Sequence, residues 1–164
     1  MALLFIGKTR CPLCGEIIEE GQKVVAFPPF IENQLDPLWV FNDSALHAEC
    51  FNNHPLAGKA QSRYKEVQEH QGPGNRFCVV CKMEIRNPDD YFTVGHLIED
   101  KGHSLYPYNY KQAHISCLTK WPDLPHLYDE IEKLQRSKTW GGDALINLLA
   151  QLRPACIGWQ QERE

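Results

Sequence analysis

The chain has 164 residues, of which 43% are hydrophobic and 23% charged, a balance typical of globular proteins rather than disordered or fibrous ones. A formal net charge of −4 argues against a general duplex-DNA binder, which needs a clear basic excess on its surface. No apolar run approaches the roughly 18 residues of a membrane span, and the apolar start is too short for a signal peptide. We therefore expect a cytoplasmic protein that makes no membrane contact.

Cysteine usage indicates metal binding. The chain has seven cysteines, and four of them form two C-x2-C pairs. The cytoplasm keeps thiols reduced, so such pairs favour metal sites over disulfides. The odd number leaves one thiol, Cys156, without a partner cysteine.

The sequence repeats itself with a period of 67 residues. Adding 67 to Cys11, Cys14, His47 and Cys50 gives Cys78, Cys81, His114 and Cys117 without a gap. The same offset pairs Ile18 with Ile85, Leu38 with Leu105 and Asn42 with Asn109. This self-similarity predicts two copies of one structural unit, at residues 1–72 and 73–139, with residues 140–164 as a C-terminal helical extension.

In the first copy, residues 11–15 are expected to form a tight knuckle whose glycine takes a left-handed conformation. Residues 23–27 read as a strand by their β-branched and aromatic content, and a returning strand is expected near residues 39–41. His47 and Cys50 are expected on the first turn of a helix, and a longer helix should cover about residues 56–70.

The second copy follows the same plan. Its strands are expected at residues 91–94 and 105–108, and its long helix at about 125–137, with Leu127, Ile131 and Leu134 inward. After Gly141 and Gly142, Asp143 can cap one more helix that should end at Pro154. The sequence thus predicts an α+β fold.

The two C-x2-C-x32-H-x2-C sets predict two structural Zn²⁺ ions. Three thiolates and one imidazole are a common closed ligand set for zinc, and four protein ligands leave no position for a reacting water. We expect each ion to supply much of the folding energy of its unit. The predicted ligands are Cys11, Cys14, His47, Cys50, Cys78, Cys81, His114 and Cys117.

A knuckle, a hairpin and a helix that carries the last two ligands is the pattern of treble-clef zinc fingers, and the chain resembles a tandem of them. The spacing is most similar to that of poly(ADP-ribose) polymerase fingers, with Trp39 shortly before His47 and Phe51 after Cys50. That resemblance implies recognition of DNA breaks through phosphate contacts. The corresponding loop here, residues 27–36, contains two acids and no basic residue.

Nucleic-acid binding would depend on basic residues near the knuckles. The candidates are Lys8, Arg10, Arg76 and Arg86. Ordinary solvated surface charges are the alternative interpretation of these side chains.

A second resemblance concerns the second copy only. Its ligands, together with His96 and Asn109, are similar to HNH-type nucleases, which embed a catalytic histidine in a treble clef. The resemblance implies that His96 activates the attacking water and that Asn109 orients His96. However, Gly95 stands where those enzymes usually have an aspartate, and Asn109 recurs as Asn42 in the first copy.

Three functions follow from these observations. The first is a non-enzymatic binding module or adaptor that recognises another protein, as LIM and RING domains do. On this interpretation the chain has no catalytic residue. The second is DNA or other nucleic-acid binding through the tandem fingers. The third is a nuclease that uses His96. The sequence leaves the partner and the oligomeric state open.

Overall fold

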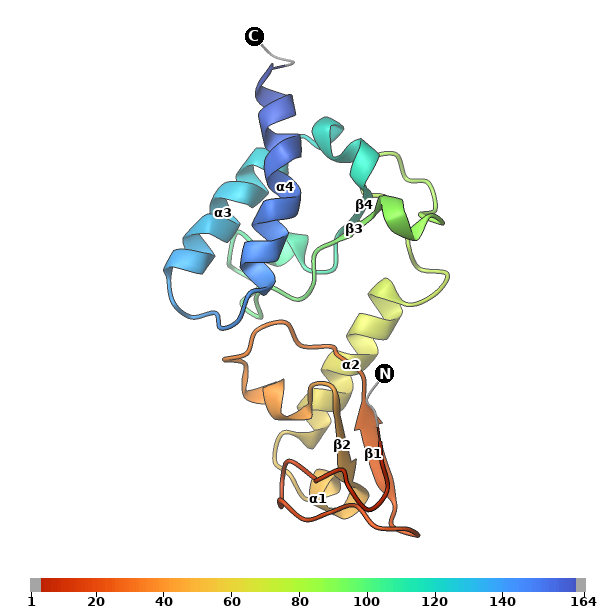
Figure 1. Cartoon of the computed structure of the whole chain (residues 1–164). Helices are drawn as coiled ribbons and strands as arrows, with labels where there is room; N and C mark the ends of the chain where they lie inside the picture. The colour runs from red at the N-terminus through yellow and green to blue at the C-terminus, as the bar shows by residue number, and fades with distance from the viewer. Residues whose placement is uncertain (1–3, 162–164) are drawn as a thin grey trace. The chain divides into compact units, whose positions relative to one another are not determined.

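The computed structural model describes residues 4–161. It divides into two compact units, Met1–Gln68 and Glu69–Glu164, each of which combines helices with one small antiparallel hairpin (Figure 1). The predicted α+β class is therefore confirmed. The outer ends of the predicted ranges 1–72 and 140–164, at residues 1–3 and 162–164, lie outside the described residues.

The first unit is a hairpin flanked by helices. Strand β1 (Val24–Phe27) pairs antiparallel with β2 (Ser44–His47), with Val24 opposite His47 and Phe27 opposite Ser44. The short helix α1 (Ala48–Asn52) begins directly after β2, and α2 (Ala57–Gln71) follows it. The predicted helix at about 56–70 agrees with α2 to within one residue at each end.

The second unit repeats the hairpin and adds two long helices. Strands β3 (Tyr91–Thr93) and β4 (Gln112–His114) pair antiparallel, with Tyr91 opposite His114. Helices α3 (Leu124–Arg136) and α4 (Ala144–Gln161) follow, and they pack against each other.

The predicted positions of both returning strands are wrong. Pro37–Phe41 and Tyr106–Tyr108 form 3-10 helices instead, and the returning strands lie further along the chain. In the first unit, Asp36 accepts a hydrogen bond from the Leu38 N–H and Pro37 stands at the first helical position, which favours a helical turn. In the second, Pro107 has no N–H to donate to a strand ladder.

Equivalent asparagines hold the segment after each first strand. Asn42 Oδ1 accepts hydrogen bonds from the Phe30 and Ile31 N–H groups at 2.7 and 2.9 Å. Asn109 Oδ1 accepts from the Leu97 and Ile98 N–H groups, the positions 67 residues further on, at 2.8 and 3.2 Å. One amide oxygen in each unit thus satisfies two backbone donors that no strand partner reaches.

Each unit has its own apolar core. The first is rich in aromatic side chains, and Phe27 lies 5.3 Å from both Phe30 and Phe51 and 5.5 Å from Tyr64, measured between ring centroids. In the second, the core joins the hairpin to the long helices, and the three residues of α3 predicted to point inward are buried. The core residues of α3 and α4 are Leu124, Leu127, Ile131, Leu134, Leu145, Leu148, Leu149, Leu152 and Ala155.

Helix α4 continues past the residue where it was predicted to end. Pro154 lies inside the helix, which runs on to Gln161. Ala155 is buried and Gly158 lies close to Thr119, so α4 stays packed against the rest of the second unit beyond the proline. None of the helices in the described part of the chain is long and apolar enough to cross a membrane.

The asparagine contacts lead to a stability prediction. Asn42→Ala and Asn109→Ala should each destabilise the unit that carries the change by about 1–3 kcal/mol, because two part-buried N–H groups lose their acceptor. Asn42→Asp keeps the acceptor and should cost less. Chemical denaturation followed by a probe in each unit measures the effect, and equal stability of Asn42→Ala and the unmodified protein would refute this role.

Candidate metal centres

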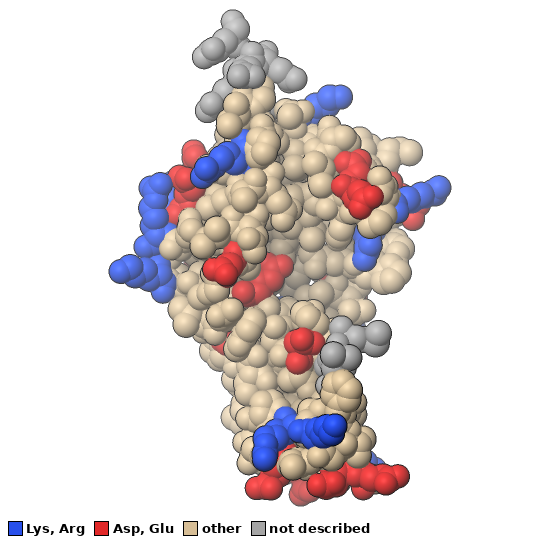
Figure 2. Space-filling model, in the orientation of Figure 1, with Lys and Arg blue, Asp and Glu red and all other residues tan. Residues whose placement is uncertain are grey.

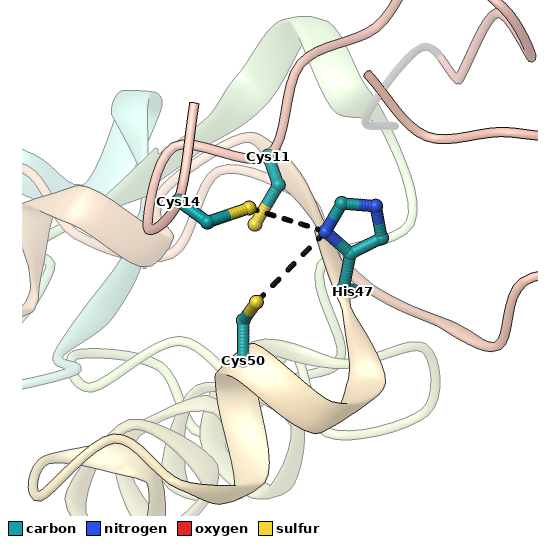
Figure 3. Close-up of side chains that lie close together, drawn as sticks. All are labelled: Cys11, Cys14, His47 and Cys50. Atoms are coloured by element: carbon teal, nitrogen blue, oxygen red, sulfur yellow. Dashed lines mark hydrogen bonds between the residues drawn. The ribbon is translucent and has the colours of Figure 1, made fainter. Parts of the chain in front are cut away.

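The eight predicted ligands form two groups that can each hold a metal ion. Cys11, Cys14, His47 and Cys50 make up the first and Cys78, Cys81, His114 and Cys117 the second. Within each group the four ligand atoms, one from each residue, all lie within 4.8 Å of one another. Figure 3 shows the first group, in which the sulfur atoms and one imidazole nitrogen point toward a common centre.

The first two ligands of each group belong to a tight knuckle. The Gly15 N–H donates to the Cys11 carbonyl at 2.8 Å, and the Lys82 N–H donates to the Cys78 carbonyl at 2.9 Å. Gly15 has a φ of 79° and Lys82 a φ of 64°. The predicted left-handed turn is confirmed, and the second unit adopts it with lysine in place of glycine, at some cost in backbone strain.

The last two ligands come from a strand and a helix rather than from one helical turn. His47 and His114 are the final residues of β2 and β4, where the backbone is extended. Cys50 lies in α1, whereas Cys117 lies in the 3-10 helix Ile115–Lys120. The predicted placement of both histidines on a helix is therefore wrong, although the three-residue spacing still brings each histidine and cysteine together.

Both histidines face the sulfur atoms with the same ring nitrogen. His47 Nδ1 lies 3.3 Å from Cys14 Sγ and 3.9 Å from Cys50 Sγ. His114 Nδ1 lies 3.4 Å from Cys81 Sγ and 3.9 Å from Cys117 Sγ. In each group Nδ1 is therefore the nitrogen positioned to ligate a metal.

The first cysteine of each knuckle has a lowered pKa. Burial by itself would raise the pKa of Cys11, but backbone N–H groups of Cys14, His47 and Leu13 donate to its sulfur and lower that pKa to about 7. In the second unit the same balance of burial against backbone hydrogen bonds lowers the pKa of Cys78 to about 6. These N–H groups stabilise a thiolate.

The helical cysteines show the opposite behaviour. Burial, with the neighbouring sulfur atoms of its own group, raises the pKa of Cys50 to about 11, and the same causes raise that of Cys117 to about 11. A second thiolate beside the first is unfavourable without a cation between them. The donor set therefore fits a divalent metal ion, whose charge would allow all the sulfurs to ionise.

The four basic candidates for nucleic-acid contacts do not form one cluster of unengaged cations. Arg10 donates to the Gly15 carbonyl at 2.9 Å. Arg76 donates to the Gln71 carbonyl at 3.4 Å and stacks over the Tyr91 ring. Arg86 pairs with Glu84 at 2.7 Å, and Lys8 lies exposed in the turn before the first knuckle.

Both residues of the nuclease hypothesis, His96 and Asn109, lie between strands β3 and β4. The Asn109 side chain binds backbone groups of Leu97 and Ile98 and so has a structural role in the turn. The His96 ring lies 5.8 Å from the ring of Tyr110. Within residues 4–161, neither group of potential metal ligands contains His96.

Two polar contacts beside the metal groups were not predicted from the sequence. Gln22 Oε1 lies 3.0 Å from His47 Nε2. In the second unit, Asp90 accepts hydrogen bonds from the Ser116 N–H and hydroxyl, both at 2.9 Å, and the backbone bond lowers the pKa of Asp90. No spacing motif marks either residue, since both contacts depend on how the hairpin folds back.

No protein-family model, curated protein or solved structure matches the chain.

The arrangement predicts two metal ions per chain. Protein purified without added metal should contain about two equivalents, and Cys14→Ser should retain about one because its first group loses a ligand. The first unit should then unfold at lower temperature. Elemental analysis and thermal melting measure these changes, with Cys156→Ser as the matched control because Cys156 belongs to neither group. Two retained equivalents in Cys14→Ser would exclude Cys14 as a ligand.

Metal affinity should depend on pH in a way set by the thiol pKa values. Between about pH 7 and 11, Cys50 and Cys117 are protonated without metal, so affinity should rise with pH as that proton becomes easier to remove. Below about pH 7, Cys11 also takes up a proton and affinity should fall more steeply. The second group should behave in the same way, because backbone hydrogen bonds lower the pKa of Cys78 to about 6. Metal release titrations measure this, and an affinity that does not change with pH would contradict it.

Proposed function

We propose that both groups hold structural Zn²⁺. Three thiolates and an imidazole are the soft donors that zinc prefers, and a set of four completes its tetrahedral coordination. Such a site has no open position for substrate. The metal would tie each knuckle to the junction between the second strand and the following helix, and so stabilise a unit with a small core.

We propose further that each unit is a treble-clef finger and that the chain arose by duplication, with copies at 1–72 and 73–139 and an added helix in 140–164. The order of knuckle, hairpin and helix supports this proposal. So does the recurrence, at an offset of 67, of the ligands, of the hairpin register and of the asparagine contacts.

For the function, we propose a non-enzymatic module that binds another protein. The observation that supports this proposal is that each group offers four ligand atoms, enough to fill the coordination of one metal ion, which would leave the surface as the place for function. The knuckle of the second unit exposes two large apolar side chains, Phe77 at 53% and Met83 at 67%. Aromatic residues and methionine are enriched in protein interfaces. Their counterparts in the first unit are Arg10 and Glu16.

Nucleic-acid binding is the second candidate, supported by the resemblance to polymerase fingers and by the basic residues beside the same knuckle. The distribution of charge argues against it. On the face in Figure 2, basic side chains are scattered among acidic and uncharged ones and form no continuous basic surface. Arg10, Arg76 and Arg86 also make the intramolecular contacts described above.

A pull-down from native lysate tests the choice. The immobilised chain should retain specific proteins both with and without nuclease treatment, and Phe77→Ser with Met83→Ser should lose them while two metal equivalents remain. Ile146→Ser with Ile157→Ser, at two exposed apolar positions on α4, is the matched control. Replacement of Lys8, Arg10, Arg76 and Arg86 by glutamine should leave capture unchanged.

Two results would overturn the protein-binding proposal. The first is binding of oligonucleotides that weakens steeply with salt and is lost in the four-glutamine variant, which would establish nucleic acid as the ligand. The second is cleavage of DNA with added Mg²⁺ or Mn²⁺ that disappears in His96→Ala at unchanged zinc content, which would establish the nuclease.

A further inference from the structure

Gln22 connects the turn before β1 with the histidine of the first metal group. Its Oε1 accepts a hydrogen bond from the Glu19 N–H at 2.7 Å and lies 3.0 Å from His47 Nε2. The opposite ring nitrogen, Nδ1, faces the sulfurs of Cys14 and Cys50. Figure 3 shows this orientation, with one imidazole nitrogen toward the sulfur atoms and the other on the far side of the ring.

These contacts determine which nitrogen of His47 carries the proton. The Glu19 N–H is a donor, so the atom of Gln22 that meets it must be the amide oxygen, which can only accept. His47 Nε2 therefore donates to the same oxygen. A neutral imidazole carries one proton, so Nδ1 has a free lone pair directed at the metal position.

The second unit has no such contact from the equivalent position. Residue 89 is an aspartate, in the 3-10 helix Pro88–Asp90, and its backbone N–H binds Asn87. The neighbouring Asp90 reaches across to Ser116 rather than to the His114 ring. The turn before the first strand thus contacts the histidine in one unit and the start of the helix in the other.

We propose that Gln22 is a positioning residue for the first metal site, and that it holds His47 in the tautomer and ring orientation that ligate through Nδ1. The inference rests on the proposed zinc site. Residues that hold a ligating histidine from outside the coordination sphere typically contribute about 10–100-fold to metal affinity. Gln22 is exposed, and an open hollow of about 750 Å³ beside it lets water compete for the Nε2–H. The expected contribution is therefore about tenfold.

The experiment is a competition titration of the full zinc-loaded chain against a chromogenic chelator. In Gln22→Ala, one of the two zinc ions should bind about tenfold more weakly and the other should be unchanged. Gln22→Glu keeps an acceptor oxygen and should bind as tightly as the unmodified protein. Asp89→Ala, at the equivalent position of the second unit, and Gln61→Ala, on the exposed face of α2, are matched controls that should change neither affinity.

A double-mutant cycle separates this role from a general effect on the turn. In a His47→Cys background the metal site keeps four ligands but has no imidazole N–H for Gln22 to accept, so Gln22→Ala should then have no effect on zinc affinity. A loss of the same size in that background would show that Gln22 only stabilises the turn through Glu19, and would overturn the proposal.

The remaining outcomes distinguish this proposal from the zinc assignment. Two bound zinc ions with equal affinity in Gln22→Ala and the unmodified chain would overturn the role of Gln22 and leave the zinc sites intact. An unmodified chain that binds no zinc would overturn both. In the loaded protein, the Nε2–H proton of His47 should exchange with water faster in Gln22→Ala than in the unmodified chain, and equal exchange rates in both would also contradict the proposal.

Discussion

The constraint on which each unit depends is the concentration of three sulfur atoms and one imidazole nitrogen within 4.8 Å. Backbone N–H groups lower the pKa of one sulfur in each group to about 7 at Cys11 and about 6 at Cys78, whereas burial, together with the neighbouring sulfur atoms, raises the pKa of Cys50 and Cys117 to about 11. A bound cation would favour ionisation of all three sulfurs, and the same atoms would then link the knuckle to the helix. The first unit has less than half the chain and a core built around five aromatic rings. A bound metal would therefore supply stability that a larger core supplies in bigger domains.

In each unit, strand pairing and the side-chain amide of one asparagine together position the metal ligands. The register puts His47 opposite Val24 and His114 opposite Tyr91, at the strand ends from which the following helices start. At the other end of the hairpin, Asn42 and Asn109 anchor the segment that leaves the first strand. The histidines thus lie on extended backbone and the last cysteines on the first turn of a helix, and the change of backbone direction between them brings both side chains toward the knuckle.

The sequence predicted the features that depend on local pattern or exact recurrence. These include the two ligand groups, the left-handed knuckle, the first strand of each hairpin and the extents of α2 and α3. It failed where two local signals compete. Residues 39–41 have strong β-propensity, but Pro37 and the Asp36 cap make them helical. Taken alone, Pro154 predicts the end of a helix. In the structure α4 continues past it, and Ala155 and Gly158 pack against neighbouring residues. The contact of Gln22 with His47 joins residues that are 25 apart and follows no motif, so only the folded hairpin reveals it.

A comparison of the units shows where their differences lie. The positions that repeat at an offset of 67 include the metal ligands and several interior residues, such as Ile18 with Ile85 and Leu38 with Leu105, which are buried. Positions that differ include the exposed knuckle residues, where Arg10 and Glu16 correspond to Phe77 and Met83, and the outer contact of the histidine, where Gln22 corresponds to Asp89. A shared interior with exposed positions that differ supports the proposal of a tandem binding protein, because each unit could then recognise a different feature of a partner.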